Sequence, residues 1–98
     1  MNIRSQNPSS PVPSSGQHLA TVSHEGRFWD VYLEFEDDPR HPSTHRGLLC
    51  YYPGDPGDDE EAVRTTVIFI EGSFEEAMRK ARGMEDTQLQ ALLRSALP

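Results

Sequence analysis

The chain has little cysteine and no long apolar stretch. Its 98 residues include a single cysteine, Cys50, so no disulfide can form within the chain and packing must hold the fold, as is usual in a reducing compartment. Cys50 lies between leucines and tyrosines, which predicts a small buried apolar side chain. No apolar run is long enough to cross a bilayer and no signal-peptide pattern is present. We therefore expect a soluble cytoplasmic protein that does not bind membranes.

Lysine is also scarce. Arginine and lysine together number 9 against 16 acidic residues, which gives a net charge of -7. No basic block interrupts this acidic background, so the chain should repel the phosphate backbone of nucleic acids. Nucleic acid is therefore not an expected partner.

Motifs that identify enzymes are missing as well. The sequence has no nucleophile elbow, no glycine-rich phosphate loop and no pairing of cysteine with histidine at catalytic spacing. No motif in it identifies a cofactor, a metal site or a catalytic residue. The sequence therefore favours a protein that is not an enzyme.

The chain divides into a tail and one domain. Residues 1–17 contain five serines, three prolines and almost nothing that could be buried, a composition typical of disorder. From residue 18 onward the pattern becomes that of strands and then helices. We therefore predict a disordered Pro/Ser-rich tail over residues 1–17 and a single domain over residues 18–98.

Four strands are predicted, followed by two helices. HLATVSH and RFWDVYLEF flank a turn at Glu25 and Gly26, RGLLCYY ends before a proline, and VRTTVIFI is apolar on both faces. Ser73 with Glu76 forms a capping pattern that opens a helix ending at Gly83, and Thr87 with Gln90 repeats this pattern. This order predicts an α+β fold, in which an antiparallel four-stranded meander is followed by two C-terminal helices packed on one face.

The segment EFEDDPRHPSTH concentrates ionisable side chains between the second and third strands. Its Asp37, Asp38, His41 and His45 would lie at the sheet end where the first helix begins, and histidine with carboxylate can bind a metal or act as a general base. The prolines exclude a regular helix here, so whether these four side chains meet depends on the conformation of the loop. A metal-dependent binder or enzyme using this loop is the alternative function. The acidic loop at residues 53–61 lies at the opposite sheet end and is interpreted as a solvated turn.

Two helices can cover only one face of the sheet, and apolar residues remain for the other face. Exposed apolar patches mark interfaces. The leading hypothesis is therefore a small interaction module that binds a protein partner or forms a homodimer through the open sheet face. The residues expected on this surface are Phe28, Tyr32, Tyr51, Ile68 and Ile70.

Overall fold

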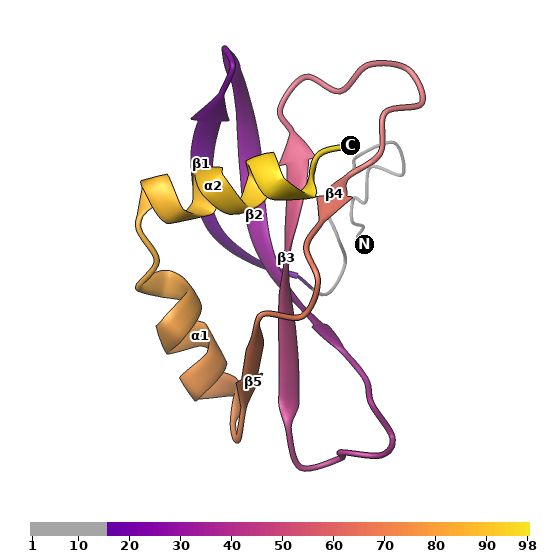
Figure 1. The fold of residues 1–98 in the computed structure, drawn as a ribbon, viewed down its shortest axis with the longest axis vertical. Coiled ribbons are helices and arrows are strands. Elements are labelled where there is room, and N and C mark those ends of the chain that lie inside the picture. The colour runs from indigo at the N-terminus through magenta and orange to yellow at the C-terminus, as the bar shows by residue number, and fades with distance from the viewer. Residues whose placement is uncertain (1–15) are drawn as a thin grey trace, which may run out of the picture.

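The computed structural model describes residues 16–98 and has an antiparallel sheet followed by two helices (Figure 1). The sheet order is β1-β2-β3-β4, with β5 also paired to β3. The elements are β1 (Gln17–His24), β2 (Arg27–Glu36), β3 (His45–Pro53), β4 (Val63–Arg64), β5 (Phe69–Glu71), α1 (Phe74–Arg82) and α2 (Asp86–Ala96). The predicted α+β fold is confirmed. Of the tail expected over residues 1–17, residues 1–15 lie outside the described part, and Gln17 is the first residue of β1.

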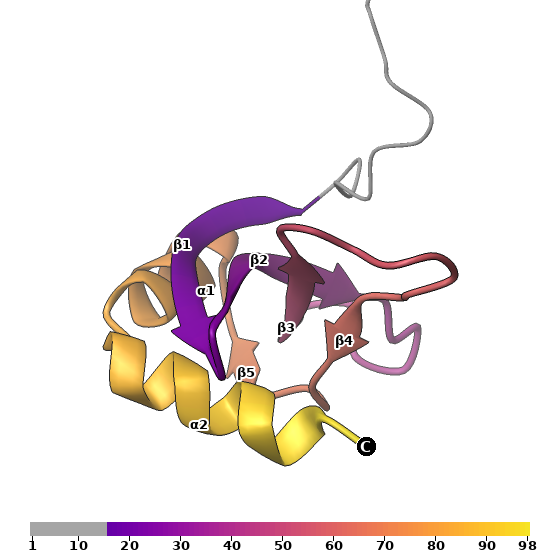
Figure 2. The ribbon, with the colours of Figure 1, turned by 90° about the horizontal axis from the view of Figure 1, so that it is seen from above.

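A two-residue turn joins β1 and β2 as predicted. Glu25 and Gly26 have φ values of 51° and 79°, and two successive positive φ angles match the twist of a hairpin. The ladder that follows is regular until a bulge between His18 and Ala20. Figure 2 shows β1 curving strongly over the rest of the sheet, as expected where a bulge increases the local twist.

The predicted fourth strand, VRTTVIFI, is divided into two short strands. A regular ladder continued from the Tyr51–Val63 pair would place Val67 opposite Gly47, but Gly47 pairs with Phe69. Two extra residues therefore leave the ladder between β4 and β5. Thr65 partly fills the gap, because its side-chain oxygen accepts a hydrogen bond from the Leu49 amide at 3.0 Å. The expectation of one continuous inner strand was wrong.

Both helices have well-formed N-termini. The Ser73 side chain accepts a hydrogen bond from the Glu76 amide at 3.1 Å, and Gly83 follows the last residue of α1, as predicted. Helix α2 begins earlier than predicted. Its capping box uses Glu85 and Gln88, so the residues Thr87 and Gln90 lie inside the helix. Among residues 16–98, no helix is long and apolar enough to cross a membrane.

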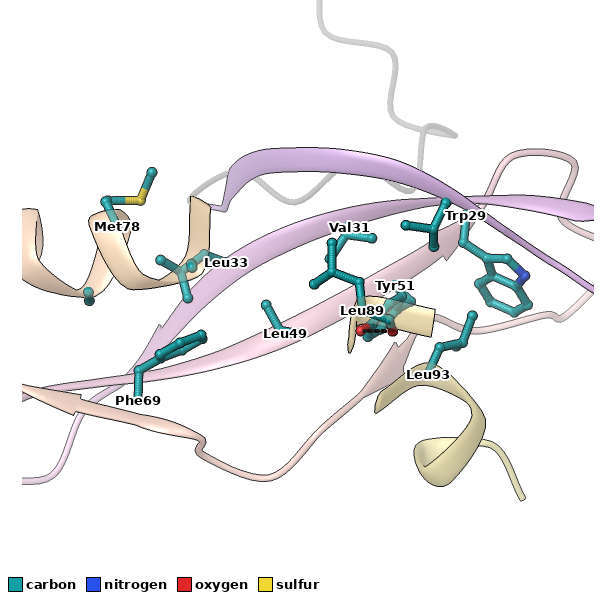
Figure 3. Close-up of a cluster of buried hydrophobic side chains, with 12 residues drawn as sticks. Trp29, Val31, Leu33, Leu49, Tyr51, Phe69, Met78, Leu89 and Leu93 are labelled. Carbon is teal, nitrogen blue, oxygen red and sulfur yellow. Dashed lines mark hydrogen bonds between the residues drawn. The ribbon is translucent and has the colours of Figure 1, made fainter. Parts of the chain in front are cut away.

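The main core lies between the helices and one face of the sheet (Figures 2 and 3). Its residues alternate along β2 and β3, where Val31 faces Tyr51 and Leu33 faces Leu49. Tyr51 is fully buried and its hydroxyl donates a hydrogen bond of 2.7 Å to the carbonyl of Leu89 in α2. Figure 3 draws this bond at the centre of the cluster. The Tyr51 hydroxyl thus joins the central strand to the last helix.

Candidate functional site

The other face of the sheet carries a row of aromatic side chains. In the β2–β3 ladder, Asp30 faces Tyr52 and Tyr32 faces Cys50, so these residues alternate with the core residues and point away from the helices. The Tyr32 ring meets the Tyr52 ring edge-on at 5.5 Å and the His18 ring at 5.2 Å. We call Phe28, Tyr52, Tyr32 and His18 the aromatic strip.

Exposure is uneven along the aromatic strip. Phe28, beside the β1–β2 turn, is 67% exposed, whereas Tyr32 and Tyr52 are 9% and 8% exposed. Cys50 is buried with the two tyrosines in a small second cluster, against which Ala62 packs. The strip therefore has a well-packed centre, and its apolar surface is presented to solvent at the Phe28 end.

Polar side chains flank the aromatic strip and largely neutralise one another. Arg64 Nε donates a hydrogen bond of 3.1 Å to Glu34 Oε1. On the other side, Asp30 Oδ1 accepts a hydrogen bond of 2.7 Å from the Thr21 hydroxyl and lies 3.3 Å from His18 Nε2. Because the carboxylates have partners of this kind, the uncovered face carries little of the net negative charge of the chain.

The Cys50 thiol in this second cluster has low reactivity. Burial raises the pKa of Cys50 to about 11, with the Glu34 carboxylate as a second cause. Burial likewise raises the pKa of Tyr52 to about 12. A thiol reacts as its thiolate, so at neutral pH Cys50 is a packing residue rather than a nucleophile.

Three of the five residues expected on the open face lie there. Phe28 and Tyr32 belong to the aromatic strip. Ile70 is 57% exposed. In the sheet ladder it lies opposite Arg46, and Arg46 lies opposite Glu36, so all three point to the same face as Tyr32. Ile70 therefore lies at the opposite end of this face from Phe28.

The placement of Tyr51 and Ile68 on that face was wrong. Tyr51 belongs to the helix-side core because it pairs with Val31. Ile68 follows the two extra residues between β4 and β5, and it packs against the helix-side core beside Leu92. Tyr52, the neighbour of Tyr51, lies on the open face in its place. The run Leu48 to Tyr52 is apolar at every position, so its alternation gives no indication of which tyrosine faces the helices.

The β2–β3 loop forms a second candidate site around Asp38. His41 Nδ1 lies 3.0 Å from Asp38 Oδ2, and the Arg40 amide donates a hydrogen bond of 3.1 Å to Asp38 Oδ1. The contact with His41 is the main reason why the pKa of Asp38 is lowered, followed by the Arg40 amide. A histidine held by a carboxylate in this way has its other nitrogen oriented for proton transfer or ligand binding.

A pocket of about 410 Å³ adjoins this pair and extends to Arg46. Within residues 16–98, His45 Nδ1 and Arg46 Nε are buried without a hydrogen-bond partner. His45 stands edge-on to the ring of Phe35 at 6.0 Å instead of joining Asp38. In this described part of the chain, no group of three or more metal-binding side chains is close enough to hold a metal ion, so the four loop residues considered from the sequence do not converge.

The acidic loop between β3 and β4 is fastened to the sheet by one arginine. Arg27 donates hydrogen bonds of 2.8 and 2.9 Å to the Glu60 carboxylate and also reaches Asp55 at 3.4 Å. Its guanidinium lies over the Trp29 ring, 5.1 Å from the centroid. Hydrogen bonding from Arg27 is the main reason why the pKa of Glu60 falls to about 2. The carboxylate of Glu60 thus serves to anchor the loop.

Comparison of the chain with protein-family models, with curated proteins and with solved structures finds no match.

Proposed function

We propose that the protein is a small interaction module that self-associates through the uncovered face of its sheet. The observation that carries this proposal is the 67% exposure of Phe28 at the end of the aromatic strip. No helix in residues 16–98 packs on this face, since both helices lie against the other one. Large exposed aromatic side chains are enriched where protein surfaces meet.

The distribution of charge supports a second copy as the partner. Two chains that each carry a net charge of -7 repel one another unless the surfaces that meet are close to neutral. The aromatic strip meets this requirement, because Arg64 pairs with Glu34 beside it. Much of the acidic charge lies elsewhere, in the loop of residues 53–61.

Size provides a second argument. A folded unit as small as residues 16–98 buries a modest core, and association of folded chains adds to its stability by mass action. We place this module in the cytoplasm, where a free thiol such as Cys50 is common.

The test is the molar mass in solution, measured by light scattering over a range of concentrations. Phe28→Asp introduces a charge where an apolar ring would be buried. Burial of one phenylalanine is worth at least about 1.5 kcal/mol, and a two-fold dimer buries two, so the dimer should weaken about a hundredfold. Thr87→Asp is the matched control, because it adds the same charge at an exposed position on α2, where the helix dipole favours an acid.

A concentration-dependent dimer that Phe28→Asp dissociates and Thr87→Asp leaves intact would support the proposal. A wild-type protein that stays monomeric at the highest concentration would refute self-association. Equal effects of the two variants would show that the interface lies elsewhere.

A second candidate function is small-molecule binding with proton transfer at the β2–β3 loop, which the 3.0 Å contact of Asp38 with His41 favours. The pocket beside it has room for a small polar ligand. Fragment screening by NMR, with the shifts of His41 and Arg46 as the readout, tests this candidate. His41→Ala should abolish any binding mapped to this pocket, and a screen without shifts at these residues would remove the candidate.

A further inference from the structure

A groove lies between the start of the first strand and the first helix, on the helix side of the sheet. Gln17 of β1 forms one wall and α1 forms the other, and the volume is about 590 Å³. Phe74, which is partly exposed, and the buried Met78 supply its apolar lining. A groove between an edge strand and a helix, with an apolar floor, is a common geometry for binding an extended peptide.

The strand that lines this groove has a free edge. Within residues 16–98, β1 pairs with β2 alone. Its sequence, QHLATVSH, contains no lysine, acidic residue or proline of the kind that commonly protects an exposed edge. Near the C-terminal end of β1, the Ser23 carbonyl accepts a hydrogen bond of 2.8 Å from the Gln90 side chain. The part of β1 nearer Gln17, which holds the bulge between His18 and Ala20, has no such contact with a helix within residues 16–98, so its outer main-chain groups are the ones that a bound peptide can reach.

The side chains that line the groove carry more positive than negative charge, which is the reverse of the whole molecule. Arg79 and Arg82 both line it, with Glu75 as the only acidic residue among its lining side chains. Arg79 already pairs with Glu76. Arg82 makes no ion pair with any residue of the described range 16–98, so its charge remains available for a ligand.

We propose that this groove binds an extended segment of another protein that carries a bulky apolar side chain next to carboxylates. The apolar side chain lies on Phe74 and Met78, the carboxylates face Arg82, and the main chain runs beside the start of β1. A basic segment is disfavoured by the two arginines. The site is separate from the face proposed for self-association, so either proposal can fail without the other.

The probes are two fluorescein-labelled synthetic octapeptides. Both contain leucine and valine alternating with threonine, and they end in two glutamates in one peptide and two lysines in the other. Fluorescence anisotropy measures their binding to the full chain. Arg82→Glu tests the proposed contact, and Arg94→Glu is the matched control. Arg94 is exposed on α2 and, like Arg82, makes no ion pair within residues 16–98.

We expect saturable binding of the glutamate peptide and at least tenfold weaker binding of the lysine peptide. An exposed ion pair is worth up to about 1 kcal/mol, so Arg82→Glu should weaken the glutamate peptide about fivefold, whereas Arg94→Glu should leave it unchanged. Amide shifts at Gln17 and Gly83 in a ¹⁵N spectrum should accompany binding.

Three results would overturn the proposal. The first is that neither peptide binds at millimolar concentration, or that both bind equally. The second is that the two variants behave alike, or that the amide shifts map to another surface. The third is a wild-type dimer that Arg82→Glu dissociates, which would assign the groove to a second copy of the chain.

Discussion

Removal of one buried oxygen, in Tyr51→Phe, tests whether Tyr51 belongs to the core. The Tyr51 hydroxyl donates its hydrogen bond to the Leu89 carbonyl at 2.7 Å in a fully buried site. Phenylalanine keeps the ring and its packing but loses this bond between β3 and α2. A buried hydrogen bond of this kind contributes about 1 kcal/mol to the free energy of unfolding, and we expect Tyr51→Phe to lower stability by about that amount.

Urea denaturation followed by tryptophan fluorescence suits this measurement, because Trp29 is in the same core cluster as Tyr51. The midpoint should fall with an unchanged slope, since the surface exposed on unfolding is the same. For a domain of this size, a loss of 1 kcal/mol lowers the thermal midpoint by roughly 4–8 °C. Both readouts should agree if unfolding is a two-state process.

Tyr32→Phe is the matched control. It removes the same atom from the opposite face, where the Tyr32 hydroxyl makes no hydrogen bond within residues 16–98, and it should change stability by less than about 0.5 kcal/mol. If Tyr51→Phe proves as stable as the wild type, or if Tyr32→Phe costs more than Tyr51→Phe, the assignment of the two tyrosines to their faces is incorrect.

Two further predictions follow from the ionisable groups. Because burial raises the pKa of Cys50 to about 11, its thiol should react with a disulfide reagent far more slowly at pH 8 in the folded protein than in urea; equal rates would contradict its burial. The pKa of Glu60 is lowered to about 2 from its usual 4.5, so its stabilising contribution is complete above pH 4.5 and is lost as the pH falls toward 2. Glu60→Gln should therefore make the urea midpoint depend less on pH in that range, and an unchanged pH dependence would show that Arg27 does not hold the loop in solution.

The sequence predicted best those elements whose ends depend on local chemistry. The turn at Glu25 and Gly26 and the helix between Ser73 and Gly83 are where the capping and turn residues place them. The start of α2 was misplaced by a few residues. Two overlapping capping patterns occur there, and the one that begins at Glu85 is the one formed.

Features that depend on long-range strand pairing were harder to predict from the sequence. The face of each tyrosine in β3 depends on the register with β2, and a run without polar residues leaves that register open. The interruption of the ladder by two extra residues between β4 and β5 depends on how Thr65 and Ile68 form hydrogen bonds with β3. Their amides donate hydrogen bonds to the carbonyls of Leu49 and Gly47, respectively. No local signal in VRTTVIFI marks this interruption, because all of its residues suit a strand.

The contact between Gln90 and Ser23 also has a consequence for synthesis of the chain. These residues are 67 positions apart, and translation at about 5–20 residues per second separates their appearance by about 3–13 s. During this interval the β1–β2 hairpin lacks the helix that covers Val22 and Trp29 in the finished fold. The apolar side chains of Val22 and Trp29 are therefore uncovered until α2 has left the ribosome, and we expect chaperones that bind exposed apolar segments to recognise the hairpin only during this interval.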